Sequence, residues 1–311
     1  MFASFNARAV GLSLSAAETI DLAAAAGFEG VDLLVRDLVD AGDDPAELRR
    51  RMVDLGLRGG AWPLPVDWRG DRGRFEADLE RLPGLAEAAA TLGLASTGTW
   101  LFPELPTRST DARGEAALFD EVFALHVDRL GAIAAVLADH GTRLGLEVIG
   151  VETARSGVGR PIFAIDGPEF ADLLAALRAR TSAVGVLVDA FHLFAAGLPL
   201  ELPMGLSVGD VVWVHVADVP AGFEGNRRAL RDRDRDRDLP GECGRIDVRE
   251  LLQTLAARGY RGPVTAEPLR ACRSLAGLGP EGAARAVRSA LGRVWPVGTP
   301  VTARDRGSLS E

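Results

Sequence analysis

Four polar residues end four consecutive apolar runs in the second half of the sequence. In chain order they are a carboxylate, a carboxylate, an imidazole and a carboxylate: Glu147, Asp189, His215 and Glu267. If the runs are parallel strands of one sheet, their carboxyl ends meet at one rim, where the catalytic groups of α/β barrels gather. An acid at one such end, taken alone, is more often a helix cap or a partner for arginine.

These four side chains together predict a metal site. No Arg or Lys stands beside them at the four strand ends, so three converging carboxylates would repel one another unless some are protonated or a cation lies between them. A cation is the simpler solution. Oxygen-rich ligation with one imidazole suits a single Mn²⁺, Mg²⁺, Co²⁺ or Zn²⁺ ion.

Other polar residues follow the same strands at short spacing. His192 comes three residues after Asp189, so we expect it on the loop above the ion, where it would contact substrate. Asp218 comes three residues after His215; either it supports the site by hydrogen bonding to the ligand histidine or to an arginine, or it is an ordinary acid of the loop. Arg237 precedes a glycine-bracketed turn on the same rim and is a candidate substrate contact.

Tryptophans mark the other side of the predicted mouth. Trp62 and Trp68 follow the third apolar run, and Trp100 ends the fourth. Rings at such positions can cover the apolar face of a substrate and exclude water, although packing in the core is an equally good interpretation. We predict that Trp62 and Trp100 contact substrate.

The elements that would position these residues alternate along the chain. Ala- and Leu-rich amphipathic stretches end at a glycine, the usual left-handed residue after a helix, and a short apolar run follows. Adding the run near Phe2 gives eight strands, with no G-x-G-x-x-G turn of the kind that an open doubly wound sheet would lead us to expect. We therefore predict an α/β fold with a single (β/α)8 TIM barrel over residues 1–294 and a polar, flexible tail over 295–311. The junction glycines are Gly27, Gly56, Gly93, Gly141 and Gly259.

Composition excludes several classes of function. The net charge of -9 disfavours nucleic acid as a partner. No apolar run is long enough to span a membrane, and no signal peptide is recognisable, so we expect a cytoplasmic protein. The chain has 2 Cys, too few for a disulfide framework. It has no lysine, which excludes Schiff-base and pyridoxal chemistry.

Several short motifs resemble the xylose isomerase-like TIM-barrel superfamily, the sugar phosphate isomerase/epimerase group that includes ketose 3-epimerases and inosose dehydratases and isomerases. The resemblance extends from about Phe2 to Leu291. One departure is visible, because the family often has Pro-Gly-x-Gly where this chain has glutamate and cysteine before the second glycine. The motifs are Leu-Glu-Val at Glu147, Val-Asp-Ala-Phe-His at Asp189, His-Val-Ala-Asp at His215, Pro-Gly-Glu-Cys-Gly-Arg-Ile-Asp from Pro240, and the run from Gly259 to Pro268.

The resemblance implies a function for the predicted site. It implies that Glu147, Asp189, His215 and Glu267 bind the metal, that Glu147 and Glu267 are also the proton-transfer pair, and that His192 binds substrate. The expected activity is isomerisation or epimerisation of a keto sugar, keto-inositol or related polyol, by proton abstraction next to a carbonyl through an ene-diolate. Members of this group often form homo-oligomers.

Three alternatives stay open at this point. A dehydratase (a lyase) would use the same enolate and then lose a β-hydroxyl group. A metal-dependent hydrolase would activate water on the same scaffold. A non-catalytic binding barrel is disfavoured by the four converging ligands. Endonuclease IV-type enzymes of the superfamily need many histidines for three zinc ions, whereas this chain has 4 in total.

Overall fold

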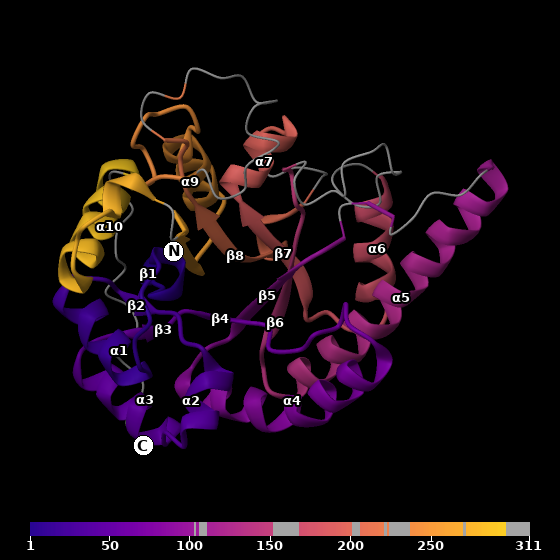
Figure 1. Cartoon of the computed structure of the whole chain (residues 1–311), viewed down its shortest axis with the longest axis horizontal. Coiled ribbons are helices and arrows are strands. Elements are labelled where there is room, and N and C mark those ends of the chain that lie inside the picture. The colour runs from indigo at the N-terminus through magenta and orange to yellow at the C-terminus, as the bar shows by residue number, and fades with distance from the viewer. Residues whose placement is uncertain are drawn as a thin grey trace.

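The protein, represented by a computed structural model, is an α/β barrel of parallel strands surrounded by helices (Figure 1). The structure describes residues 1–102, 104–105, 111–151, 168–200, 206–220, 223, 237–269 and 272–296. The strands lie in the order β3-β2-β1-β9-β8-β7-β6-β5-β4. They are β1 (Phe2–Phe5), β2 (Gly30–Val31), β3 (Arg58–Gly59), β4 (Ala61–Pro63), β5 (Ser96–Trp100), β6 (Arg143–Glu147), β7 (Val184–Asp189), β8 (Val211–Val216) and β9 (Pro263–Ala266).

The first and last strands of this order are two parts of one predicted strand. β3 pairs with β2, β4 pairs with β5, and only Gly60 separates the two. At the break, the Ala61 N–H donates to Asp32 Oδ1 (2.8 Å). A Cβ atom on Gly60 would lie 2.1 Å from Asp32 Oδ1 and from Ser4 Oγ, so only glycine fits beside this buried carboxylate. The split strand thus accounts for nine short strands in a barrel with eight positions.

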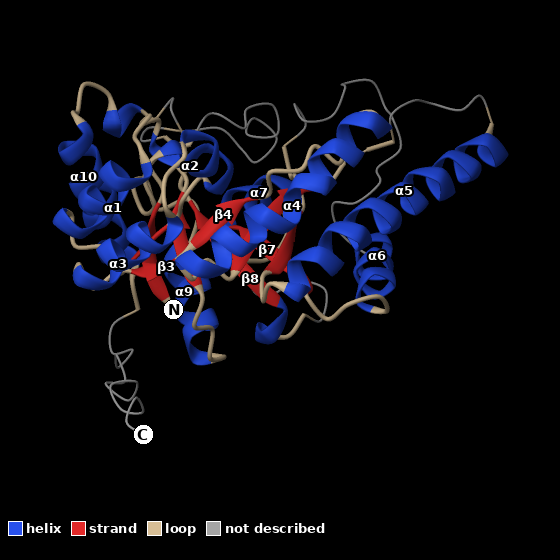
Figure 2. Cartoon of the chain, turned by 90° about the horizontal axis from the view of Figure 1, so that it is seen from below, coloured by secondary structure: helices blue, strands red, loops and turns tan. Residues whose placement is uncertain are grey.

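The helices cover the outside of the strands (Figure 2). The longest, α5, extends away from the rest of the fold at one end in both views (Figures 1 and 2). The helices are α1 (Ala16–Ala25), α2 (Val35–Ala41), α3 (Pro45–Asp54), α4 (Arg72–Leu92), α5 (Ala112–Asp139), α6 (Pro168–Arg178), α7 (Ala190–Ala196), α9 (Val248–Ala257) and α10 (Pro280–Val294), with 3-10 turns at Arg8–Val10, Val208–Asp210 and Arg273–Leu275.

Helix ends follow the local sequence. Ser15 and Glu18 form a capping box at the start of α1, and Asp71 caps α4 by accepting from the Arg74 N–H. All five predicted junction glycines have positive φ, between 70° and 91°. Each reverses the chain from helix to strand in a conformation that costs other residues energy. The predicted alternation of helix and strand is therefore confirmed.

Apolar side chains form a large core between the strands and the helices and a small cluster of Ala61, Leu187 and Trp213. The predicted α/β TIM barrel is confirmed. Helix α10 ends at Val294, and all but the first two residues of the predicted tail lie outside the described residues. In the part of the chain that the structure describes, no helix combines the length and apolar content needed to cross a membrane.

Candidate active site

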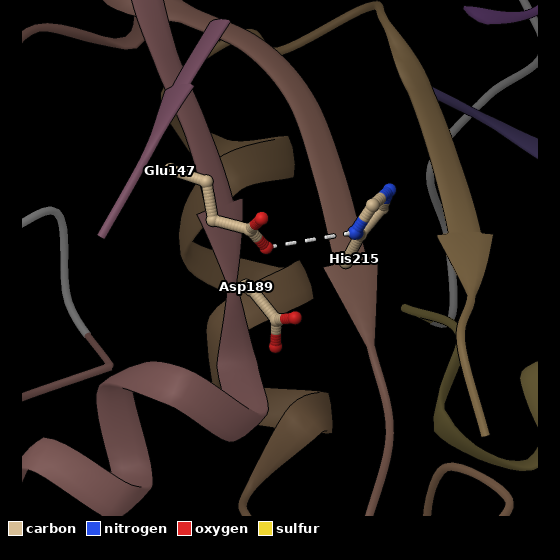
Figure 3. Close-up of side chains that lie close together, drawn as sticks. All are labelled: Glu147, Asp189 and His215. Atoms are coloured by element: carbon tan, nitrogen blue, oxygen red, sulfur yellow. Dashed lines mark ion pairs between the residues drawn. The ribbon is translucent and has the colours of Figure 1, made fainter. Parts of the chain in front are cut away.

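Three of the four predicted metal ligands meet at the carboxyl ends of β6, β7 and β8. One ligand atom from each of Glu147, Asp189 and His215 lies within 4.8 Å of the others. Figure 3 shows the two carboxylates on neighbouring strands, with the imidazole facing Glu147. β6 pairs with β7, and β7 pairs with β8 with Asp189 opposite His215, so the sheet brings the three side chains together.

The fourth predicted ligand, Glu267, directly follows β9 on the other side of His215. Its Oε2 lies 3.4 Å from His215 Nδ1, and Glu147 Oε1 lies 3.8 Å from the same nitrogen. The two glutamates thus approach one imidazole nitrogen from β6 and from the end of β9.

An arginine lies among these carboxylates, which corrects the expectation that no cationic side chain would. Arg237 Nη1 donates to Asp189 Oδ2 (2.8 Å) and to Glu267 Oε2 (2.9 Å). Its side chain is 2% exposed. The sequence did not predict this contact, because Arg237 lies far from the strand ends along the chain. The loop after β8 brings it back to the rim, where Asp238 pairs with Asp218. Repulsion among the acids alone therefore does not require a metal ion.

Burial and charge divide the site into groups of different pKa. Burial, together with the negative charge of Asp189, raises the pKa of Glu147 well above its usual value. Burial opposes the charge of Asp189, but Arg237 and the two histidines outweigh it and hold the pKa of Asp189 low. The pKa of Glu267 is also lowered, because His215 and Arg237 outweigh its burial. The glutamates and Asp189 raise the pKa of His215 to about 9 despite its burial.

The donor set fits a divalent metal ion. Both ring nitrogens of His215 are buried without a hydrogen-bond partner among the described residues. Asp189 Oδ1 accepts from the N–H groups of Phe191 and His192, which orients its carboxylate. An imidazole and carboxylates at this spacing are ligands for Zn²⁺, Mn²⁺ or Co²⁺. Glu147, Asp189, His215 and Glu267 would hold the ion. The guanidinium of Arg237 would offset part of the negative charge of Asp189 and Glu267.

Two predicted substrate contacts, His192 and Arg237, lie behind the site instead of at its surface. His192 is 3% exposed on α7, and its Nε2 lies 3.0 Å from Arg237 Nη2. Neither residue lines the cavity in front of Glu147. The side chain of His192 turns toward Arg237, and the guanidinium of Arg237 bonds to the two carboxylates, so substrate contact by either residue stays a prediction.

Of the two predicted tryptophan contacts, only Trp100 reaches the cavity. Trp100 is 39% exposed and lines it, with the Arg69 guanidinium 3.8 Å from the centre of its ring. Trp62 is fully buried and packs in the core, which corrects the prediction. Successive side chains of a strand point to opposite faces, so Ala61 faces the barrel interior and Trp62 the helices.

Asp218 supports a loop and not the ligand histidine. Its carboxylate accepts from the backbone N–H groups of Cys243, Gly244 and Ile246. No hydrogen bond to His215 or Arg237 is found for it among the described residues, so the expected partner was wrong. The acid fixes the turn after Pro240, where the sequence departs from the motif of the similar proteins.

The site opens into a cavity of about 770 Å³. Glu147, His215 and Glu267 line it at one place, and Leu187, Trp213 and Trp100 supply apolar walls. Sequence reasoning missed Asn6 and Arg8, which also line it. Asn6 directly follows β1 and Arg8 begins the 3-10 turn after it, so the rule that selected the four ligands from strand ends could have found them. Residues 231–236 of the alternating Arg/Asp run lie outside the described residues.

The sequence matches the model of a known family, described as xylose isomerase-like TIM barrel, over residues 20–291. The chain belongs to this family. The resemblance found in the motifs is thereby confirmed, and the match covers all four predicted metal ligands. The cluster of Glu147, Asp189 and His215 therefore lies on a barrel of the xylose isomerase-like family.

Similar proteins include enzymes. A 3-dehydroshikimate dehydratase of Pseudomonas aeruginosa is 29% identical over 263 residues, covering 83% of this chain and 37% of that protein. The chain therefore spans just over a third of the length of this curated relative. A xylose isomerase domain protein from Alicyclobacillus acidocaldarius is 26% identical, with a TM-score of 0.77, covering 94% of this chain and 98% of that one. The fold is also similar to that of the IolI protein, whose structure has a zinc atom (17% identity, TM-score 0.73, coverage 94% and 98%).

We expect purified protein to bind one divalent ion per chain at this cluster. Binding to the native state alone should raise the free energy of unfolding, by about 2.7 kcal/mol at a metal concentration of 100 times Kd. Metal analysis and thermal melts with Mn²⁺, Co²⁺, Zn²⁺ or EDTA would measure this. His215→Ala should remove the shift, whereas His140→Ala, at the C-terminal end of α5 before β6 and outside the cavity, should keep it. An equal shift in both variants would place the ion elsewhere.

Proposed function

We propose that the protein is a metal-dependent enzyme that moves a proton at the carbon next to a carbonyl group of a polyhydroxylated keto compound, such as a keto sugar or keto-inositol. The observation that carries this proposal is the placement of Glu147 and Glu267 within 4 Å of the same His215 nitrogen, at the wall of one cavity. A hydrolase needs one base near its water and gives no reason for such a pair.

The residues of the chain divide the work of the reaction. A bound divalent ion would polarise the substrate carbonyl and acidify the neighbouring C–H bond. One glutamate removes that proton, which leaves an ene-diolate, and the other returns a proton to the opposite face of the same carbon or to its neighbour. Trp100, Trp213 and Leu187 supply apolar walls for the substrate. Arg237 keeps Asp189 ionised and oriented throughout.

Isomerisation or epimerisation is the outcome favoured by two glutamates that line one cavity beside the same imidazole. Dehydration is the second candidate, and the similarity to 3-dehydroshikimate dehydratase supports it. Both begin with the same proton abstraction. They differ only in whether the ene-diolate regains a proton or loses a β-hydroxyl group as water, with the second glutamate supplying the proton for the leaving group.

Proton exchange with solvent tests the proposal. We expect the metal-loaded enzyme in heavy water to introduce deuterium next to the carbonyl of a true substrate, chosen from ketohexoses, keto-inositols and 3-dehydroshikimate. Mass spectrometry and NMR of recovered substrate and product would locate the label. A new stereoisomer indicates epimerisation, and loss of water indicates dehydration. Turnover of a substrate with no exchange at any carbon would contradict the ene-diolate route and favour a hydrolase.

A further inference from the structure

The cavity has a cationic side chain at its mouth that the proposed reaction does not use. Among the described residues that line it, Arg8 is the only arginine, and the chain has no lysine. Glu147, His215 and Glu267 line the same cavity, so one space connects the reacting groups with Arg8. The lining between them is mostly apolar, with Leu12, Pro63 and Trp100 among its members.

The backbone that carries Arg8 is held in place. The Ala9 N–H donates to Asn6 Oδ1 (3.0 Å), and the Gly11 N–H donates to the carbonyl oxygen of Arg8 (3.0 Å). Ala9 and Val10 are buried and anchor the turn in the core. A side chain on such a turn starts from a fixed point of the rim, so less conformational entropy is lost when it binds a ligand.

The guanidinium of Arg8 has no carboxylate partner in the described part of the chain. No ion pair and no hydrogen bond joins its side chain to a described residue, although Arg36, Arg178 and Arg237 on other parts of the rim or barrel all pair with aspartates. Asp37 lines two neighbouring hollows with Arg8 but does not line the catalytic cavity. The exposed, unpaired cation is therefore free to bind an anion that enters the cavity.

We propose that Arg8 is a specificity-determining residue that binds an anionic oxygen group of the substrate, a carboxylate or a phosphate, at the end opposite the keto-hydroxyl group that reacts. The Arg8 subsite depends on the proposed function in one respect: the proposed function decides which end of the substrate reacts. An arginine fork binds either anion through paired N–H donors, and the interaction is stronger than a neutral hydrogen bond. Neutral ketoses and keto-inositols would lack this contact.

A binding experiment that needs no turnover tests the subsite. The probes are benzoate, phenyl phosphate and the neutral benzamide, each titrated into the metal-loaded chain by calorimetry or ligand-detected NMR. We expect at least one anion to bind about tenfold more tightly than benzamide, the size of a charge-assisted hydrogen bond at an exposed position. The tighter of benzoate and phenyl phosphate identifies the kind of anion.

Variants separate Arg8 from other causes of anion binding. Arg8→Gln should abolish the preference over benzamide, and Arg8→Lys should keep part of it. Arg285→Gln is the matched control, because it removes the same charge from an exposed pair on α10 outside the cavity. Persistence of the preference in Arg8→Gln, or no preference in the unaltered protein, would overturn the subsite. If the subsite binds anions but no keto compound exchanges its proton, the proposed function fails instead.

Discussion

Glu147→Gln and Glu267→Gln should each lower turnover by about 10² to 10⁴, the contribution of a general acid or base. Both side chains line the cavity at strand ends, so under the proposed function each substitution removes a proton-transfer group while the barrel remains folded. Glutamine keeps the volume and one acceptor oxygen but cannot carry a proton between carbon and solvent. Steady-state kinetics and solvent deuterium exchange on the identified substrate would measure the effect.

Three controls make this test specific. Circular dichroism should show an unchanged fold, and metal analysis should separate loss of the ion from loss of the acid or base. Glu242→Gln is the matched variant, because Glu242 lies on a loop of the same rim, pairs with Arg293 and does not line the cavity. Near-normal turnover in either Glu147→Gln or Glu267→Gln with the metal bound would exclude that residue from the proton-transfer pair.

Arg237→Gln should lower the free energy of unfolding of the metal-free protein by about 3 kcal/mol. Arg237 is buried between Asp189 and Glu267, and its removal leaves the fully buried carboxylate of Asp189 without its directly bonded cation, with only the histidines to offset its charge. Breaking one side of a buried ion pair has this large effect because the remaining charge is not solvated. Urea unfolding followed by circular dichroism in EDTA would give the difference.

Metal should reduce the loss in free energy of unfolding caused by Arg237→Gln, because a divalent cation neutralises the same two carboxylates. Arg293→Gln is the comparison, since its ion pair with Glu242 is exposed and should contribute less than about 1 kcal/mol. An Arg237→Gln protein as stable as the original in EDTA would mean that Asp189 and Glu267 are neutral or solvated without the arginine. A deficit that metal leaves unchanged would mean that Arg237 stabilises the loop and not the site.

Much of the site was predictable because parallel strands end at one rim. Apolar runs followed by Glu147, Asp189 and His215 were enough to predict that these side chains meet, since pairing of adjacent strands places their last residues side by side. The glycine junctions predicted the alternation of helix and strand for the same local reason: a left-handed residue after a helix has few alternatives to glycine.

Only the tertiary structure decided how the loops complete the site. Arg237 is 48 residues from Asp189 in the sequence, yet its guanidinium bonds to that carboxylate because the loop after β8 returns to the rim. No local periodicity reports such a return. Asp218 likewise bonds to the turn that contains Gly244 and not to the histidine three residues before it. The strand breaks at Gly60, beside the buried carboxylate of Asp32, which follows β2 and accepts from the Ala61 N–H. Sequence by itself therefore determined the barrel and the strand-end acids through local rules, whereas charge compensation and cavity lining depended on contacts between distant segments.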